Sequence, residues 1–180
     1  MNAEEDVFDY HAFISYSRDD NKVPGREWAN WLKKRLEGFR VPQSCVGRET
    51  KYGPVPSRLG QVFLDRSDMT AEGMINNTLV DKISKSRFLL LVCSPKSAAS
   101  KFVGLEIEQF IRCHGPRRII RIVIAGEQLP GSAAPKIFND ALALSDTTEG
   151  SQSATGTNSI YIDFRVTAEL PGGGKHIRDG

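Results

Sequence analysis

Cysteine and histidine are scarce in this 180-residue sequence, which contains three of each. The cysteines Cys45, Cys93 and Cys113 form no CxxC pair, and neither they nor the scattered histidines have the spacing of a metal site. We therefore expect no bound metal. Cys93 lies inside an apolar run and is expected to be a small buried core residue.

Long apolar runs and an excess of one charge are missing as well. The longest apolar run is about half a dozen residues, far short of a membrane span, so no membrane contact is expected. A net charge of +2 is too small to favour nucleic acid or an anionic membrane. Three arginines cluster without interleaved aromatics, which favours a solvated rim over a nucleic-acid site: Arg117, Arg118 and Arg121.

A targeting pattern is absent from the N-terminal segment. The first ten residues, MNAEEDVFDY, are acidic and lack the basic stretch followed by an apolar stretch that marks a signal peptide. The few cysteines form no disulfide framework. A reducing cytoplasm is therefore the expected location.

What is present is an ordinary globular composition, with 39% hydrophobic and 26% charged residues. The length suits one α/β domain, or one domain plus a tail. Short apolar runs alternate with segments of helical spacing, which predicts a doubly wound sheet of about five parallel strands with helices on both faces. The expected strands are 11–16, 61–65, 87–93, 118–124 and 160–164.

Apolar residues at helical spacing predict the helices between these strands. Gly38 is expected to end the first helix, and residues 130–144 form a weaker helical region, best between 135 and 144. Residues 145–159 are rich in Ser, Thr and Gly and are expected to be mobile. The two clearest stripes are Trp28, Trp31, Leu32, Leu36 and Phe39, and then Ile75, Leu79, Val80 and Ile83.

Residues 40–60 are a long connection for a compact domain, with three prolines and three glycines. Either they cover a functional site or they are a mobile insertion. Ligands of doubly wound sheets bind beyond the carboxyl ends of the strands, which selects residues 16–20, 65–74 and 94–106. No Gly-rich phosphate fingerprint and no Walker loop follows any expected strand, which disfavours an ordinary Rossmann or NTPase interpretation.

Glu106 stands out in the third of these segments. Along 94–111, helical spacing predicts a core-facing stripe with Glu106 at its margin, beside Phe102, while Glu108 points away. A carboxyl at the edge of an apolar face is expected to be partly desolvated, with a raised pKa. The alternative is a helix-surface acid that flanks the core. The stripe consists of Ala99, Val103, Ile107, Phe110 and Ile111.

Three motifs, in this order, resemble those of a Toll/interleukin receptor (TIR) domain of the bacterial kind. HAFISYSRDD resembles the first box, QVFLDRSDMTAEGMI the second box with its BB loop, and SPKSAASKFVGLEIEQF the serine-bearing strand exit followed by Ser-x-aromatic-Val-x-x-Glu. One departure is Phe102, where many members carry tryptophan. The resemblance implies a flavodoxin-like TIR domain over 8–165, an N-terminal tail over 1–7, and a linker or truncated C-terminal extension over 166–180.

Members with this glutamate include enzymes that cleave NAD+ between nicotinamide and ribose, so the resemblance implies a catalytic role for Glu106. NAD+ is then the substrate and no cofactor is implied. A carboxylate can stabilise the oxocarbenium-like ribose that remains when nicotinamide leaves. The positions expected to bind substrate are Tyr16, Ser17, Arg18, Asp65, Ser100 and Phe102, with Arg18 as the phosphate partner.

Alternatives remain open for two of these side chains. Arg18 can instead form a surface salt bridge with Asp19 or Asp20, and Asp65 can cap the next helix or orient a hydroxyl group. The BB loop of similar proteins packs against a neighbouring domain, which implies self-assembly with other TIR domains. The residues expected to carry that contact are Arg66, Asp68, Met69, Glu72 and Met74.

Two classes of function compete. The first is an NAD+ glycohydrolase that produces ADP-ribose or a cyclic isomer. It would be activated by self-assembly and fused to a sensor domain beyond residue 180 in a bacterial defence or signalling protein. The second is a non-catalytic TIR interaction module that signals by homotypic contact, as receptor adaptors do. Glu106 discriminates between them, because a scaffold has no chemical reason to carry it. A weaker third interpretation is a receiver-like or deoxyribosyltransferase-like fold.

Overall fold

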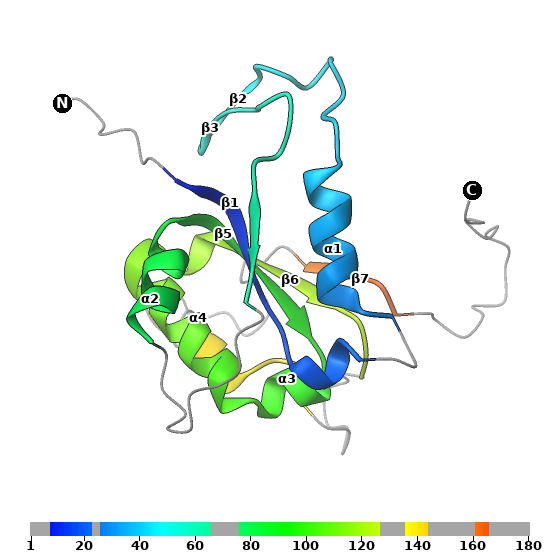
Figure 1. The fold of residues 1–180 in the computed structure, drawn as a ribbon, viewed down its shortest axis with the longest axis vertical. Coiled ribbons are helices and arrows are strands. Elements are labelled where there is room, and N and C mark those ends of the chain that lie inside the picture. Colours follow the sequence, from blue (N-terminus) through cyan, green and yellow to red (C-terminus); the bar gives the residue numbers. More distant parts are fainter. Residues whose placement is uncertain (1–7, 23–25, 66–75, 127–135, 144–160, 166–180) are drawn as a thin grey trace, which may run out of the picture.

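The computed structural model describes residues 8–22, 26–65, 76–126, 136–143 and 161–165. Its centre is a parallel five-stranded sheet in the order β4-β1-β5-β6-β7 (Figure 1). This flavodoxin-like order confirms the predicted fold class. The strands are β1 (Tyr10–Ser15), β4 (Val62–Leu64), β5 (Ser86–Cys93), β6 (Ile119–Val123) and β7 (Tyr161–Asp163).

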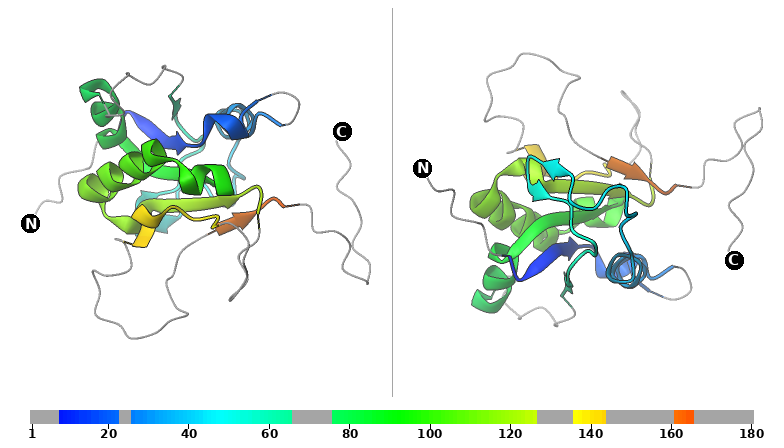
Figure 2. Two further views of the ribbon diagram at one scale, coloured as in Figure 1. Left: turned by 90° about the horizontal axis from the view of Figure 1, so that it is seen from below. Right: turned by 90° about the horizontal axis from the view of Figure 1, so that it is seen from above.

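Helices cover both faces of the sheet (Figure 2). One face packs against α1 (Trp28–Glu37), through Ala29 and Leu32. The other packs against α2 (Asn77–Ser84) and α4 (Lys101–His114). Because side chains alternate along a strand, Phe13 of β1 faces α4 whereas Ala12 and Ile14 face α1.

Cys93 is fully buried at the end of β5, as predicted. The first helix ends before Gly38, also as predicted, so Phe39 lies beyond it and is 49% exposed instead of joining the apolar stripe. No helix among the described residues is long and apolar enough to cross a membrane. The same residues contain no cluster of three or more potential metal-binding side chains.

Two helical expectations differ from the structure. The segment after β5 is two helices, α3 (Pro95–Ala99) and α4, because the backbone of Ser100 is extended. The break changes the helical phase, so Ala99 is exposed and does not belong to the buried stripe. Within the weaker helical region, the described part, 136–143, contains one 3-10 helix, η3 (Asp140–Leu142).

The connection 40–60 contains a small antiparallel hairpin, β2 (Glu49–Thr50) and β3 (Gly53–Pro54). Tyr52 at its tip donates a hydrogen bond of 2.8 Å to the backbone oxygen of Arg117 and packs edge-on against Phe88. Both partners lie at the amino ends of strands. The hairpin therefore lies at the opposite end of the sheet from the carboxyl ends and does not cover them (Figure 1).

Candidate active site

A pocket of about 410 Å³ lies at the carboxyl ends of β1, β4 and β5. It brings together all seven residues named from the sequence as the catalytic group and its substrate-binding neighbours. Segments that are up to 90 positions apart in the chain meet here because parallel strands end at one edge of the sheet. The lining consists of Tyr16, Ser17, Arg18, Asp19, Asp65, Lys96, Ala99, Ser100, Phe102 and Glu106.

Glu106 is the buried acid of this pocket. Its side chain, on the second turn of α4, is 3% exposed, so the alternative of a helix-surface acid is wrong and the acid is more buried than its place at the stripe's margin predicted. Oε2 accepts a hydrogen bond of 2.6 Å from Oγ of Ser15. Ser15 was missed by the sequence analysis, although a serine at the end of an apolar strand facing a helix is a detectable signal.

Burial raises the pKa of Glu106 to about 8, and the nearby carboxylate of Asp65 adds to the rise. The Ser15 hydroxyl and the Arg18 guanidinium act in the opposite direction, because both favour the charged form. The predicted direction of the pKa shift is therefore confirmed. Near neutral pH, Glu106 is therefore mostly a neutral acid that a nearby cation can ionise.

Cationic side chains lie on the side of the pocket formed by η1 (Arg18–Asp20) and α3. Arg18 comes from η1, and Lys96 comes from the first turn of α3. The ammonium group of Lys96 also donates a hydrogen bond of 3.0 Å to the backbone oxygen of Asp19. Lys96 and Asp19 lie in the segments 94–106 and 16–20 that the sequence analysis selected, but they were not named there as binding residues.

A serine connects η1 to α3 on the cationic side of the pocket. Ser94 is the N-cap of α3 and forms a capping box with Ser97, and its hydroxyl donates to the Asp20 carboxylate. Asp20 is half buried, and burial raises its pKa, against which the Ser94 hydrogen bond and the charge of Lys96 act. The last residue of η1 is thereby fixed to the start of α3.

The break between α3 and α4 is held by a residue from another part of the chain. Nδ2 of Asn139 donates to the backbone oxygens of Ser97, Ala98 and Ser100 at 3.0–3.2 Å. Gly104 makes room for this side chain, because a Cβ there would lie 3.1 Å from Oδ1 of Asn139. Asn139 thus bonds three carbonyls at the junction, of which those of Ser97 and Ser100 also accept backbone amides, from Ser100 and Gly104. Ser100 itself caps α4 by accepting from Val103 N.

Tyr16 and Asp65 join the ends of β1 and β4. The Tyr16 hydroxyl donates a hydrogen bond of 2.9 Å to the backbone oxygen of Asp65. The cap of α2 is Asn76, whose side chain accepts from Leu79 N, so Asp65 does not cap that helix. The residues expected to form the assembly contact, Arg66, Asp68, Met69, Glu72 and Met74, lie outside the described residues.

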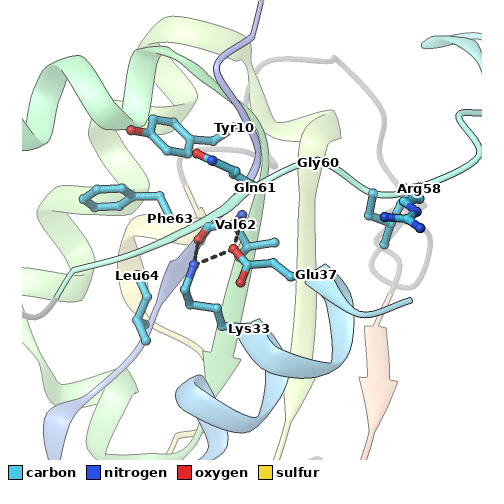
Figure 3. Close-up of a pocket in the computed structure, with 10 residues that line it drawn as sticks. Tyr10, Lys33, Glu37, Arg58, Gly60, Gln61, Val62, Phe63 and Leu64 are labelled. Atoms are coloured by element: carbon cyan, nitrogen blue, oxygen red, sulfur yellow. Dashed lines mark hydrogen bonds and ion pairs between the residues drawn. The ribbon is translucent and has the colours of Figure 1, made fainter. Parts of the chain in front are cut away.

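A second hollow of about 660 Å³ lies away from this site, along the edge strand β4 (Figure 3). There, Lys33 of α1 donates to the backbone oxygen of Val62, and the Val62 amide donates to Glu37 at 3.0 Å. Lys33 and Glu37 also form an ion pair. The polar groups seen in Figure 3 therefore satisfy the strand edge, which assigns this hollow a structural role.

Three comparisons with known proteins show what the chain is similar to. A family model described as TIR domain matches residues 58–165. The NAD(+) hydrolase ApTIR of Actinoplanes sp. is 30% identical over 118 residues, which is 66% of this chain but 14% of that protein. Among solved structures, the TIR domains of the activated Roq1 resistosome directly recognizing the pathogen effector XopQ superpose with a TM-score of 0.45 at 17% identity, covering 77% of this chain and 69% of that one.

Proposed function

The chain belongs to the TIR domain family, and we propose that it hydrolyses the bond between nicotinamide and ribose in NAD+. The observation that carries this proposal is a buried carboxyl group, Glu106, in a pocket that is also lined by the cations Arg18 and Lys96. The similarity to an NAD(+) hydrolase from Actinoplanes sp. supports it.

The charges of the pocket match those of a dinucleotide. Arg18 and Lys96 suit the pyrophosphate, and the carboxyl of Glu106 suits the ribose that carries the cationic nicotinamide ring. The half-buried ring of Phe102, one turn before Glu106, gives a flat apolar wall against which a nicotinamide or adenine ring can stack. Tyr16, Ser17, Asp65 and Ser100 complete the proposed contacts with polar groups.

In the proposed reaction the carbon–nitrogen bond breaks first, and nicotinamide leaves as a neutral base with both bonding electrons. The ribose becomes oxocarbenium-like, and the Glu106 carboxylate stabilises its positive charge. Water then adds to the anomeric carbon and loses a proton, which yields ADP-ribose. If a nitrogen of the substrate's own adenine attacks instead, the product is a cyclic isomer. The reaction needs no second acid besides Glu106, because nicotinamide leaves without being protonated.

Ionisation of Glu106 is part of this proposal. Glu106 is mostly neutral near pH 7, since burial raises its pKa to about 8. The positive pyridinium ring of bound NAD+ favours the charged carboxylate, so binding is expected to release a proton. The substrate itself would then generate the group that stabilises the transition state.

Activation by self-assembly with other TIR domains, and a role as the effector of a bacterial defence or signalling protein, belong to the same proposal. The proposal also includes fusion to a sensor domain beyond residue 180. The part of the chain that matches the Actinoplanes relative corresponds to 14% of that protein's length. We also place the reaction in the cytoplasm, where thiols such as Cys45, Cys93 and Cys113, which are free in the structure, stay reduced.

The test follows nicotinamide release by chromatography from NAD+ mixed with dilute protein and with protein concentrated enough to assemble. We expect turnover from the parent and from Glu108→Gln, a control on the same helix but outside the pocket lining, and none from Glu106→Ala or Glu106→Gln. Equal turnover in the Glu106 variants would remove this residue from the mechanism. If the parent is inactive in both conditions, the non-catalytic interaction module becomes the better interpretation.

A further inference from the structure

Ser15 donates a hydrogen bond to the proposed catalytic group from inside the protein. It is the last residue of β1 and is fully buried, and it does not line the pocket. Since alternate residues of a strand share a face, Ser15 lies on the same side as Phe13, towards α4. Its hydroxyl therefore approaches Glu106 from the sheet, whereas substrate would approach from the pocket.

The surroundings of Ser15 are those of an apolar residue. It lies beside Leu91 in the register of β1 and β5, on the face that packs the main hydrophobic cluster. A hydroxyl group in such a place is costly unless it is hydrogen-bonded, and an alanine would fill nearly the same volume. The oxygen that it contacts, Oε2 of Glu106, is 2.6 Å away. The hydroxyl therefore contributes a hydrogen bond to the carboxyl group, whereas the packing does not require it.

One oxygen of the carboxyl is thereby fixed. Among the described residues, the Glu106 side chain makes one hydrogen bond, and Ser15 donates it. We propose that Ser15 is a positioning residue of the NAD+-cleaving site: it holds Oε2 of Glu106 against the end of β1, so that Oε1 meets the ribose. This inference rests on the proposed function, because it assumes that Glu106 acts on a substrate.

The same hydrogen bond affects the protonation of Glu106. Three kinds of group act on this carboxyl from the elements around it: the Asp65 carboxylate after β4, the Arg18 guanidinium of η1, and the Ser15 hydroxyl of β1. Asp19 and Lys96 are the other charged groups of the pocket lining. Removing the Ser15 donor removes one of the groups that lower the pKa of Glu106. Burial and the Asp65 carboxylate then raise this pKa further. A larger share of the protein is then neutral at a given pH.

The variants are Ser15→Ala, which removes the donor, and Ser15→Thr, which keeps a hydroxyl group, with thermal melts to confirm folding. We expect Ser15→Ala to lower kcat by about 10- to 100-fold with little change in KM, as for the loss of one hydrogen bond to a charged group. The acid limb of its pH–rate profile moves to higher pH. Ser15→Thr restores the parental profile.

A second measurement does not need turnover. Carbon-13 NMR of labelled glutamate follows the titration of the Glu106 carboxyl, with Glu106→Gln identifying its signal. We expect the midpoint to lie at higher pH in Ser15→Ala than in the parent. An unchanged midpoint together with an unchanged kcat would overturn the role of Ser15, while an active parent and an inactive Glu106→Gln would leave the proposed function standing. An inactive parent with a shifted midpoint would reject the function alone.

Discussion

The hydroxyl of Ser94 donates a hydrogen bond to the carboxylate of Asp20, 74 positions earlier in the chain. This contact fixes η1, which carries Arg18, to the N-terminus of α3, which carries Lys96. Lys96 adds a second contact through the backbone oxygen of Asp19. The cationic side of the pocket is therefore built as a unit from two short helices that follow different strands.

Breaking this contact is expected to weaken substrate binding more than catalysis. Asp20→Ala removes the acceptor, so η1 and its arginine lose their fixed position beside Lys96. We expect KM for NAD+ to rise about 3- to 10-fold, with kcat nearly unchanged. Asp20→Asn keeps a side-chain acceptor and is the matched control, with KM near the parental value. A lower kcat at constant KM would assign Asp20 to the chemical step instead.

The activity is expected to depend on pH through Glu106. In the proposed mechanism the charged carboxylate is the active form, and burial raises the pKa of this group to about 8. Because kcat/KM reports the ionisation of the free enzyme, it should rise about tenfold per pH unit below that value and level off above it. Initial rates from about pH 6 to about pH 9 test this. A flat profile over that range contradicts the assignment.

Because burial disfavours the charged form of Glu106, ionisation of this residue destabilises the folded state. Its pKa is about 8 when folded and 4.5 without the protein environment, so the folded chain holds a proton that the unfolded chain releases between those values. The free energy of unfolding therefore falls as the pH rises through this window. Glu106→Gln cannot ionise and should be more stable than the parent at about pH 8, by on the order of a few kcal/mol. Denaturant titrations at about pH 5 and pH 8 measure the difference, which should shrink to about 1 kcal/mol or less at the lower pH.

Asn139 and Gly104 are expected to act together on stability. Asn139→Ala leaves carbonyls at the α3–α4 junction without their side-chain partner and should lower the free energy of unfolding by about 1–3 kcal/mol. Gly104→Ala places a methyl group 3.1 Å from Oδ1 of Asn139 and should disturb the same junction. Gly60→Ala is the control, because its Cβ would make an ordinary contact of 3.8 Å with His11. Additive losses in the Asn139/Gly104 double variant would show that the two act separately.

The sequence predicted those parts of the site that depend on topology. Apolar runs located the strands, and the rule that ligands bind at the carboxyl ends grouped Tyr16, Asp65 and Glu106, which follow three different strands or their helices. What it missed depends on contacts distant in sequence. Continuous helical spacing concealed the break at Ser100, because the residue that holds it, Asn139, lies 39 positions later. The partner of Ser15 is 91 positions away, so only the packing of α4 on β1 reveals it.

The pair Lys33 and Glu37 has a consequence for how copies of this domain meet. The backbone N–H and C=O of Val62 point away from β1, and both are hydrogen-bonded to side chains of α1. An incoming strand therefore finds no free backbone groups at this part of β4. At this point of the edge, a neighbouring chain would have to displace an ion pair before it could extend the sheet. The fold thereby protects this part of the sheet edge against the addition of strands from other chains, and the proposed self-assembly would have to use other surfaces.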